Sequence, residues 1–177
     1  MALRKILLKS DPALRKVCRP VTDFGPRTCD LLTDLAQTMA SADGLGLAAP
    51  QVGILRRAVV IVDGEEVVEL VNPEITEKSE ETTGAFEGCL SCPDERAYLQ
   101  RPVRVVVRAQ DRAGAPFERA FEQMAARAAC HEIDHLDGKL FIDLAERVYS
   151  DEELDELLER TDAQAPEEKG GEEKDRA

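Results

Sequence analysis

Hydrophobic residues recur along the chain with two different periods, one typical of helices and one typical of strands. The first helical pattern covers residues 24–42, where apolar side chains return every three or four residues. This spacing predicts an amphipathic helix with one face turned to the core. The apolar positions are Leu31, Leu32, Leu35 and Met39.

Two pairs of strands are predicted after this helix. Residues 57–62 and 67–71 are rich in β-branched residues and flank Asp63-Gly64, a signal for a hairpin turn. A second pair, residues 103–110 and 116–122, surrounds a turn at 111–114. A helix, antiparallel strands and then a second helix predict an α+β fold. The chain has 177 residues, 43% of them hydrophobic, which is enough for one core and a single domain.

The second helix is predicted from residue 123 onward. Residues 123–130 are mostly small and apolar, a composition typical of a helix packed tightly inside a domain. Asp137-Gly138 is a typical stop signal, because glycine readily adopts the left-handed conformation that ends many helices. We therefore expect antiparallel strands packed around this central helix.

The only two histidines of the chain lie on this helix, in His131-Glu132-Ile133-Asp134-His135. Residues four apart share one helix face, so His131 and His135 can reach one metal ion. Glu132 can then reach a water on that ion and serve as a base. A surface helix with solvated polar residues is the alternative, and the small apolar residues before His131 argue against it. Two buried imidazoles need partners, and a metal is the natural one.

A catalytic zinc-type site uses three protein ligands, so a third ligand must come from elsewhere. The number of cysteines, five, is odd and the first ten residues lack a signal-peptide pattern, which predicts free thiols in a reducing cytoplasm. Cys89 is the best candidate, because Gly88 permits close backbone approach. Cys92 gives a C-x-x-C spacing that could instead indicate a structural zinc knuckle. Such a knuckle needs two further ligands and leaves the histidines unexplained. Cys18, Cys29 and Cys130 are interpreted as small buried hydrophobic residues.

A glycine-rich segment, residues 44–51, offers similar chemistry. It reads Gly-Leu-Gly-Leu-Ala-Ala-Pro-Gln, with two glycines for close approach and one amide side chain, Gln51. It lacks the Gly-Lys-Ser/Thr ending of a phosphate loop. A tight turn after the first helix is the simpler interpretation of this segment taken alone.

Three segments in this order, G-x-G-x-A-A-P-Q, E-G-C-L-S and H-E-x-D-H-L, resemble the peptide deformylase family of the bacterial type. The resemblance covers about residues 4–147. Further matching segments are residues 11–15, 20–21, 71–73 and 137–141.

This resemblance implies a hydrolase that removes the formyl group from the N-terminal formyl-methionine of new polypeptides and releases formate. A water activated by one divalent metal would attack the formyl carbon. The implied metal ligands are Cys89, His131 and His135; the implied general acid and base is Glu132; and the implied oxyanion donors are Gln51 and the backbone N–H of Leu90.

The resemblance also implies an apolar slot for the methionine side chain. Its positions here are Leu45, Ala85, Met124 and Ala128, with Arg127 on the same helix face expected to turn its head outward and offer only its stem. The peptide would pair as an added strand with backbone groups of Leu45, Gly46 and Gly88. Arg96 matches a position near the mouth of the site.

The family implies ferrous iron in the cell, with zinc, nickel or cobalt able to occupy the same ligands. A Cys/His/His set suits these metals comparably. Two residues depart from the family pattern: Cys130 stands where a glutamine is usual, and Cys92 where a larger aliphatic residue is common. We expect Cys130 to remove one hydrogen bond near the site.

The chain changes character after residue 149. Ser150-Asp151-Glu152-Glu153 is a capping box that predicts a short helix over residues 150–160 with Leu154, Leu157 and Leu158 on its apolar face. Residues 161–177 form an acidic tail predicted to be disordered, and residues 150–177 carry 12 acidic and 4 basic residues. The predicted organisation is a catalytic domain at 1–149, this helix and this tail. A solvating tail is favoured over an interaction tail for a basic partner.

The net charge of −13 disfavours direct nucleic-acid binding, although a position near the ribosome, where nascent chains emerge, remains open. No apolar stretch is long enough to cross a membrane, and the absence of heptads favours a monomer. The sequence leaves two other functions as alternatives. A metallopeptidase would usually use a third His or Glu ligand, and a binding module without activity would not need the complete set of ligands, base and amide.

Overall fold

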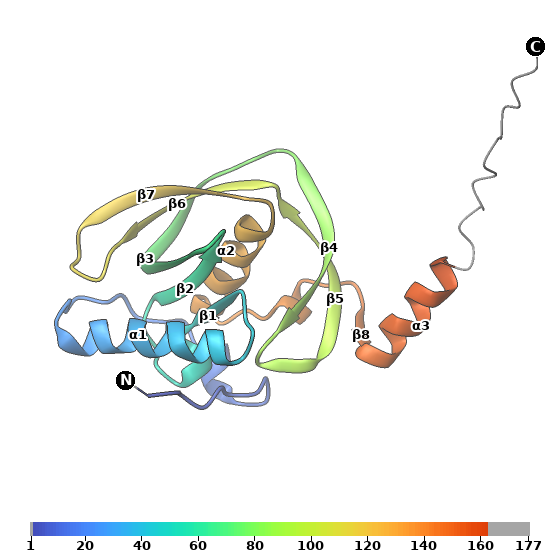
Figure 1. Cartoon of the computed structure of the whole chain (residues 1–177), viewed down its shortest axis with the longest axis horizontal. Helices are drawn as coiled ribbons and strands as arrows, with labels where there is room; N and C mark the ends of the chain where they lie inside the picture. The colour runs from blue at the N-terminus through green and yellow to red at the C-terminus, as the bar shows by residue number, and fades with distance from the viewer. Residues whose placement is uncertain (1, 163–177) are drawn as a thin grey trace, which may run out of the picture.

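The computed structural model describes residues 2–162 and contains two antiparallel sheets and three α-helices (Figure 1). The α-helices are α1 (Pro26–Ser41), α2 (Gln123–Leu136) and α3 (Asp151–Asp162). The strands are β1 (Gly46–Ala48), β2 (Ala58–Asp63), β3 (Glu66–Lys78), β4 (Thr82–Cys89), β5 (Cys92–Pro102), β6 (Arg104–Gln110), β7 (Pro116–Glu122) and β8 (Val148–Ser150). Short 3₁₀ turns are η1 (Pro12–Arg15), η2 (Ala49–Val52) and η3 (Phe141–Asp143).

The two sheets lie around α2. One sheet has the order β1-β2-β3-β6-β7 and the other has the order β4-β5-β8, with neighbouring strands antiparallel throughout. Figure 1 shows α2 between the curved strands on one side and the β4–β5 hairpin on the other, with α1 along the outside of β1 and β2. The predicted α+β class, with strands around a central helix, is confirmed.

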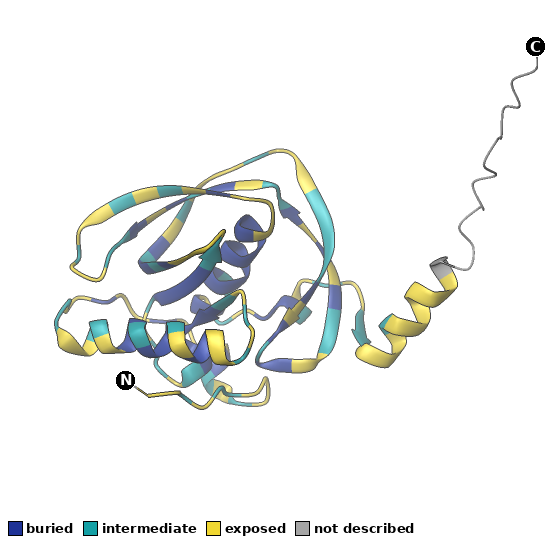
Figure 2. Ribbon diagram, viewed as in Figure 1, coloured by how far each residue is buried: buried dark blue, intermediate teal, exposed yellow. Residues whose placement is uncertain are grey.

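Helix α2 is buried along most of its length, with 11 of its 14 residues buried (Figure 2). Its small residues Ala125, Ala126, Ala128 and Ala129 pack against β2, β3, β6 and β7 in the largest core cluster. Because alanine has a short side chain, the helix backbone can approach the sheet closely, and the polar residues that follow are carried into the interior.

The hairpins predicted from the sequence are present, as β2–β3 and β6–β7. The strand predicted at 67–71 is longer, because β3 continues past a bulge after Val71 to Lys78. The hairpin of β4 and β5 was not predicted. Thr82–Cys89 contains two glycines and only a few apolar residues, so it lacks the alternation by which a strand is recognised.

The ends of two helices follow the predicted signals. Helix α2 stops at Leu136, and Gly138 has φ of 72°, the left-handed conformation expected there. The capping box of α3 is formed, since Ser150 N–H donates to Glu153 Oε2 at 3.0 Å and Glu153 N–H donates to Ser150 Oγ at 3.1 Å.

Helix α3 extends to Asp162, two residues beyond its predicted end, and projects from the body of the molecule (Figures 1 and 2). Leu157 and Leu158 on its apolar face are 39% and 48% exposed. The acidic tail from residue 163 onward lies outside the described residues. Within the described part of the chain, no helix is long and apolar enough to cross a membrane.

Candidate metal and catalytic site

Three potential metal ligands meet between α2 and the end of β4. One ligand atom from each of Cys89, His131 and His135 lies within 4.8 Å of the others, and Cys89 Sγ is 3.3 Å from His135 Nε2. All three side chains are buried. Burial also holds the pKa of His135 well below its usual value, which keeps the imidazole neutral and able to bind a metal. A Cys/His/His donor set at this spacing fits one divalent transition-metal ion.

Cys89 is placed by the tight turn between β4 and β5. Leu90 and Ser91 form this turn, and Cys89 pairs directly with Cys92 across it. Contact with the Cys92 thiol, together with burial, raises the pKa of Cys89. Within the described residues, the group that could hold a metal joins Cys89 to the two histidines and does not include Cys92. The geometry therefore gives no support to a zinc knuckle.

The other cysteines differ in burial. Cys18 and Cys130 are 4% exposed, as predicted for small buried residues, and burial raises the pKa of each thiol. Cys29 is only half-buried on α1, so its predicted burial is wrong. The buried face of α1 carries the leucines, whereas Cys29, near the start of the helix, does not belong to that face.

Glu132 points into the same site from α2. Its side chain is buried, and its Oε2 has no hydrogen-bond partner among the described residues. Burial raises the pKa of Glu132 to about 7. A carboxyl group with this pKa can both accept and return a proton near neutral pH.

The side-chain amide of Gln51 lies next to Cys89. Its Oε1 accepts a hydrogen bond from the Ala48 N–H at 2.8 Å, which fixes the orientation of the amide. Its Nε2 then donates toward Ser91 Oγ at 3.2 Å and Cys89 Sγ at 3.5 Å. The glycine-rich segment is thus more than a tight turn, because it forms β1 and η2 and directs an N–H donor into the site.

Glu87 is a site residue that the sequence interpretation missed. Its carboxylate lies 3.0 Å from His131 Nδ1 and accepts hydrogen bonds from Arg101 and Arg127. Although burial opposes ionisation, the hydrogen bonds from His131 and Arg101 lower the pKa of Glu87 to about 2. The ring N–H of His131 therefore donates to an ionised carboxylate, which leaves Nε2 as the nitrogen available to a metal. The sequence signal that could have identified Glu87 is its position two residues before Cys89, because residues two apart lie on the same side of a strand.

The expected orientation of Arg127 is wrong. Its guanidinium turns inward rather than outward, and the side chain is 7% exposed. Hydrogen bonds to Glu87 and to two backbone carbonyls offset the cost of burying its charge.

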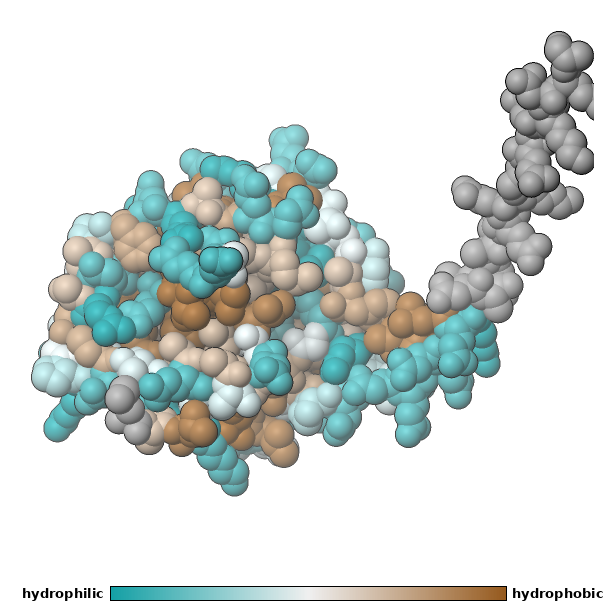
Figure 3. Space-filling view, viewed as in Figure 1, coloured by the Kyte–Doolittle hydropathy of each residue, from teal (hydrophilic) through white to brown (hydrophobic). Residues whose placement is uncertain are grey.

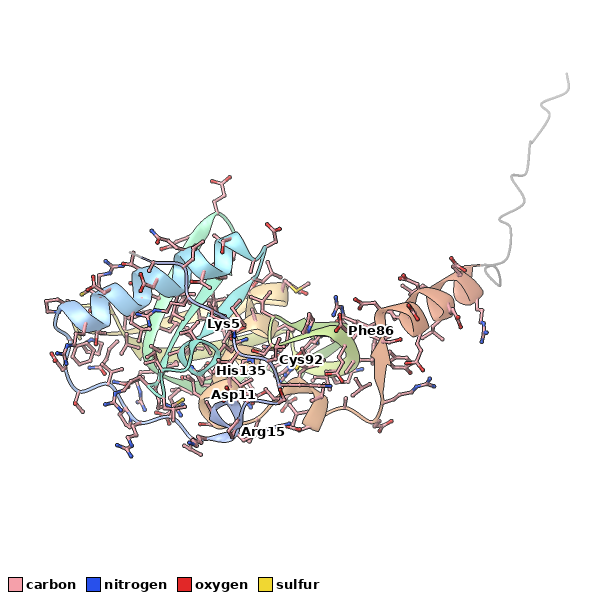
Figure 4. All side chains as sticks on the ribbon, turned by 90° about the horizontal axis from the view of Figure 1, so that it is seen from below. Lys5, Asp11, Arg15, Phe86, Cys92 and His135 are labelled. Carbon is pink, nitrogen blue, oxygen red and sulfur yellow. The ribbon has the colours of Figure 1, made fainter. Side chains whose placement is uncertain are left out.

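A cavity of about 480 Å³ opens beside these groups. Ala85 and His135 are not among its lining residues, and Phe86, which was not predicted, lies in the wall. Figure 4 shows Cys92 and His135 near the centre of the molecule and Phe86 farther out on the side of α3. The predicted residues that line the cavity are Leu45, Gly46, Gln51, Gly88, Cys89, Leu90, Arg96, Met124, Arg127, Ala128, His131 and Glu132.

The rim of this cavity is partly apolar. Leu45 and Met124 are 50% and 57% exposed and both line the cavity, so they offer apolar surface to a ligand bound there. In the space-filling view, hydrophobic residues gather at the centre of one face with polar residues around them (Figure 3).

A buried Cys/His/His set, a carboxyl group with raised pKa and an amide donor beside one open cavity define a metal-dependent hydrolase. Comparison with known proteins shows which family within this class the chain resembles. Residues 3–150 match the family model described as polypeptide deformylase. The chain belongs to the polypeptide deformylase family.

Individual relatives agree with this assignment. The peptide deformylase of Caldicellulosiruptor bescii is 52% identical over 162 residues, covering 92% of this chain and 97% of the relative. That of Thermoanaerobacter pseudethanolicus is 48% identical, covering 90% and 99%. The crystal structure of peptide deformylase from Thermotoga maritima has 42% identity and a TM-score of 0.79, covering 81% of this chain and 97% of that one. The protein is thus an enzyme that removes the N-terminal formyl group from nascent polypeptides.

Proposed function

We propose that Cys89, His131 and His135 hold the metal ion, that Glu132 is the general acid and base, and that Gln51 and the backbone N–H of Leu90 stabilise the oxyanion. One observation carries this proposal. The three buried ligand atoms lie within 4.8 Å of one another, and Glu132, whose Oε2 has no hydrogen-bond partner among the described residues, lines the cavity together with Cys89 and His131.

A bound divalent ion would supply Lewis-acid chemistry, lowering the pKa of water and polarising the formyl oxygen. The side chains of the chain supply the rest. Glu132 takes a proton from the attacking water and later delivers it to the leaving amine, a task suited to a pKa of about 7. Gln51 presents Nε2 where negative charge develops on the formyl oxygen. The fixed bond from Ala48 N–H to Gln51 Oε1 holds the donor in place before substrate arrives.

The substrate's first side chain would occupy the apolar part of the cavity, against Leu45, Met124 and Ala128. A deformylase structure from Acinetobacter baumannii, 32% identical with a TM-score of 0.76, is described as bound to Met-Ala-Ser. We infer that a peptide of this kind binds here with its backbone along Gly46 and Gly88. Arg96 lines the cavity, and we propose that it lies near the mouth of the site.

We further propose ferrous iron as the metal in the cell, with zinc, nickel or cobalt as substitutes. Five free cysteines support a reducing, cytoplasmic location. Residues 1–149 are proposed as the catalytic unit of a monomer that works near the ribosome, where its substrates emerge.

The test is formate release from formyl-Met-Ala-Ser by anaerobically purified, iron-loaded protein. Glu132→Ala should lower kcat by about 10² to 10⁴-fold while metal remains bound at one ion per chain. Glu156→Ala, an exposed carboxylate of α3, is the matched control and should leave the rate unchanged. No formate from wild-type protein with one tightly bound metal would overturn the proposal. Cleavage of an internal peptide bond in the same assay would identify a metallopeptidase instead.

A further inference from the structure

Glu87 holds one of the most completely bonded carboxylates of the described structure. Its Oε1 accepts from Arg101 Nε at 2.9 Å and from Arg127 Nη1 at 2.8 Å. Its Oε2 accepts from Arg101 Nη2 at 3.1 Å and lies 3.0 Å from His131 Nδ1. Each oxygen therefore has two partners, which leaves the carboxylate no freedom to rotate away from the histidine.

Arg127 has a particular position in this network. It precedes His131 by four residues on α2, so both side chains leave the same helix face. Its guanidinium also donates to Leu99 O at 3.0 Å and Thr83 O at 2.7 Å. Arg127 thus connects α2 to both β4 and β5, and it is one of the residues that line the cavity.

Arg101 by itself does not provide all the hydrogen bonds that hold the Glu87 carboxylate in place. Its remaining nitrogen, Nη1, donates to Asp134 Oδ2 at 2.8 Å, so Arg101 is shared between two carboxylates. Arg127 therefore supplies a second positive charge beside Glu87. With Arg101 alone, the negative charge of the buried carboxylate would be only partly compensated.

We propose that Arg127 is a positioning residue of the deformylase reaction. It acts through Glu87, fixing the carboxylate that orients the His131 ring toward the metal. This role rests on the proposed function of His131 as a metal ligand. A purely structural role, in which Arg127 only ties the carbonyls of Thr83 and Leu99 to α2, is the alternative that the experiment must separate.

The experiment compares wild type with Arg127→Met and Arg127→Lys. Methionine keeps an apolar stem in the cavity and removes every donor, whereas lysine keeps the charge and one bond. The zinc dissociation constant is measured by competition with a chromogenic chelator, and kcat and KM are measured with formyl-Met-Ala-Ser. Arg127→Met should weaken zinc binding by about 10 to 100-fold and lower kcat by a similar factor, with KM nearly unchanged. Arg127→Lys should recover part of both losses.

A double-mutant cycle with Glu87→Gln separates the two roles. If Arg127 acts through Glu87, adding Arg127→Met to Glu87→Gln should change zinc affinity by less than about twofold. Arg108→Met, an exposed arginine of β6 paired with Glu74, is the matched control and should change neither quantity.

The proposal is overturned if Arg127→Met lowers only the midpoint of thermal unfolding and leaves zinc affinity intact. It is also overturned if the loss of affinity is the same in the Glu87→Gln background. Should Arg127→Met fail to fold, the cycle is run with Arg127→Lys, whose partial loss must likewise disappear in that background. If wild-type protein itself binds no zinc, the assignment of the metal ligands has failed instead.

Discussion

Gly46 lies so close to Glu132 that a methyl group on Gly46 would stand 2.6 Å from both Cγ and Oε1 of the glutamate. Strand β1 therefore passes directly over the buried carboxylate of α2, and the missing side chain of Gly46 makes the room that Glu132 occupies. This contact joins two segments that are 86 residues apart in the chain.

Gly46→Ala should displace Glu132, the proposed general acid and base, and lower kcat by more than about tenfold, because small shifts of such a group are costly. The measurement is formate release together with thermal unfolding. Gly64→Ala is the control: nothing lies within 4 Å of its added methyl, but φ is 65°, so it should reduce stability without changing kcat. Equal kcat values for Gly46→Ala and wild type would show that the carboxylate is not held by this contact.

Because Glu132 is buried, we expect the free energy of unfolding of the metal-free protein to depend on pH. Its folded pKa of about 7 lies above the ordinary 4.5, so the folded state binds the proton more tightly than the unfolded state. Stability should therefore fall as pH rises from about 4.5 to about 7. Glu132→Gln removes this cost, and its advantage over wild type should grow by about 3 kcal/mol across that window. Urea unfolding of chelator-treated protein at several pH values tests this, and a pH-independent difference would contradict it.

Gln51→Glu should lower kcat by about 10² to 10³-fold with little change in KM. The carboxylate can still accept from Ala48 N–H, but it can no longer donate to an oxyanion. Ser91→Ala removes the hydroxyl that accepts from Gln51 Nε2 but keeps Gln51 itself as a donor. It should therefore lower kcat by at most about tenfold. The reverse order of the two variants would assign the oxyanion donor elsewhere.

Loss of the α3 cap should have no effect on catalysis. Ser150→Ala removes the hydrogen bond to Glu153 N–H and should destabilise the first turn of α3 by about 1 kcal/mol. Hydrogen exchange at Glu153 should become faster, while kcat/KM for formyl-Met-Ala-Ser stays at the wild-type value. A fall in kcat/KM would show that α3 supports the cavity.

Much of the site could be predicted because its chemistry is local. A helix of known period places His131 and His135 on one face, and that geometry holds wherever the helix lies. Cys89 could be selected as the third ligand from its neighbour Gly88, whereas the role of Gln51 required a resemblance, because no spacing within the chain relates Gln51 to α2. Glu87 and the inward turn of Arg127 escaped prediction, since a charged residue on a strand or helix is ordinarily solvated.

Local sequence patterns were sufficient to predict the helices with a clear apolar period, the hairpins marked by turn residues, and the residues able to bind a metal. These features depend on interactions within a few residues. Which polar groups are buried together depends on contacts between distant segments and is visible only in the folded protein. The β4–β5 hairpin has little apolar alternation, and it is joined to α2 by the ion pairs Glu87–Arg127 and Arg101–Asp134. Such ionic contacts form between distant segments only after the hydrophobic core has brought them together, so no local pattern records them.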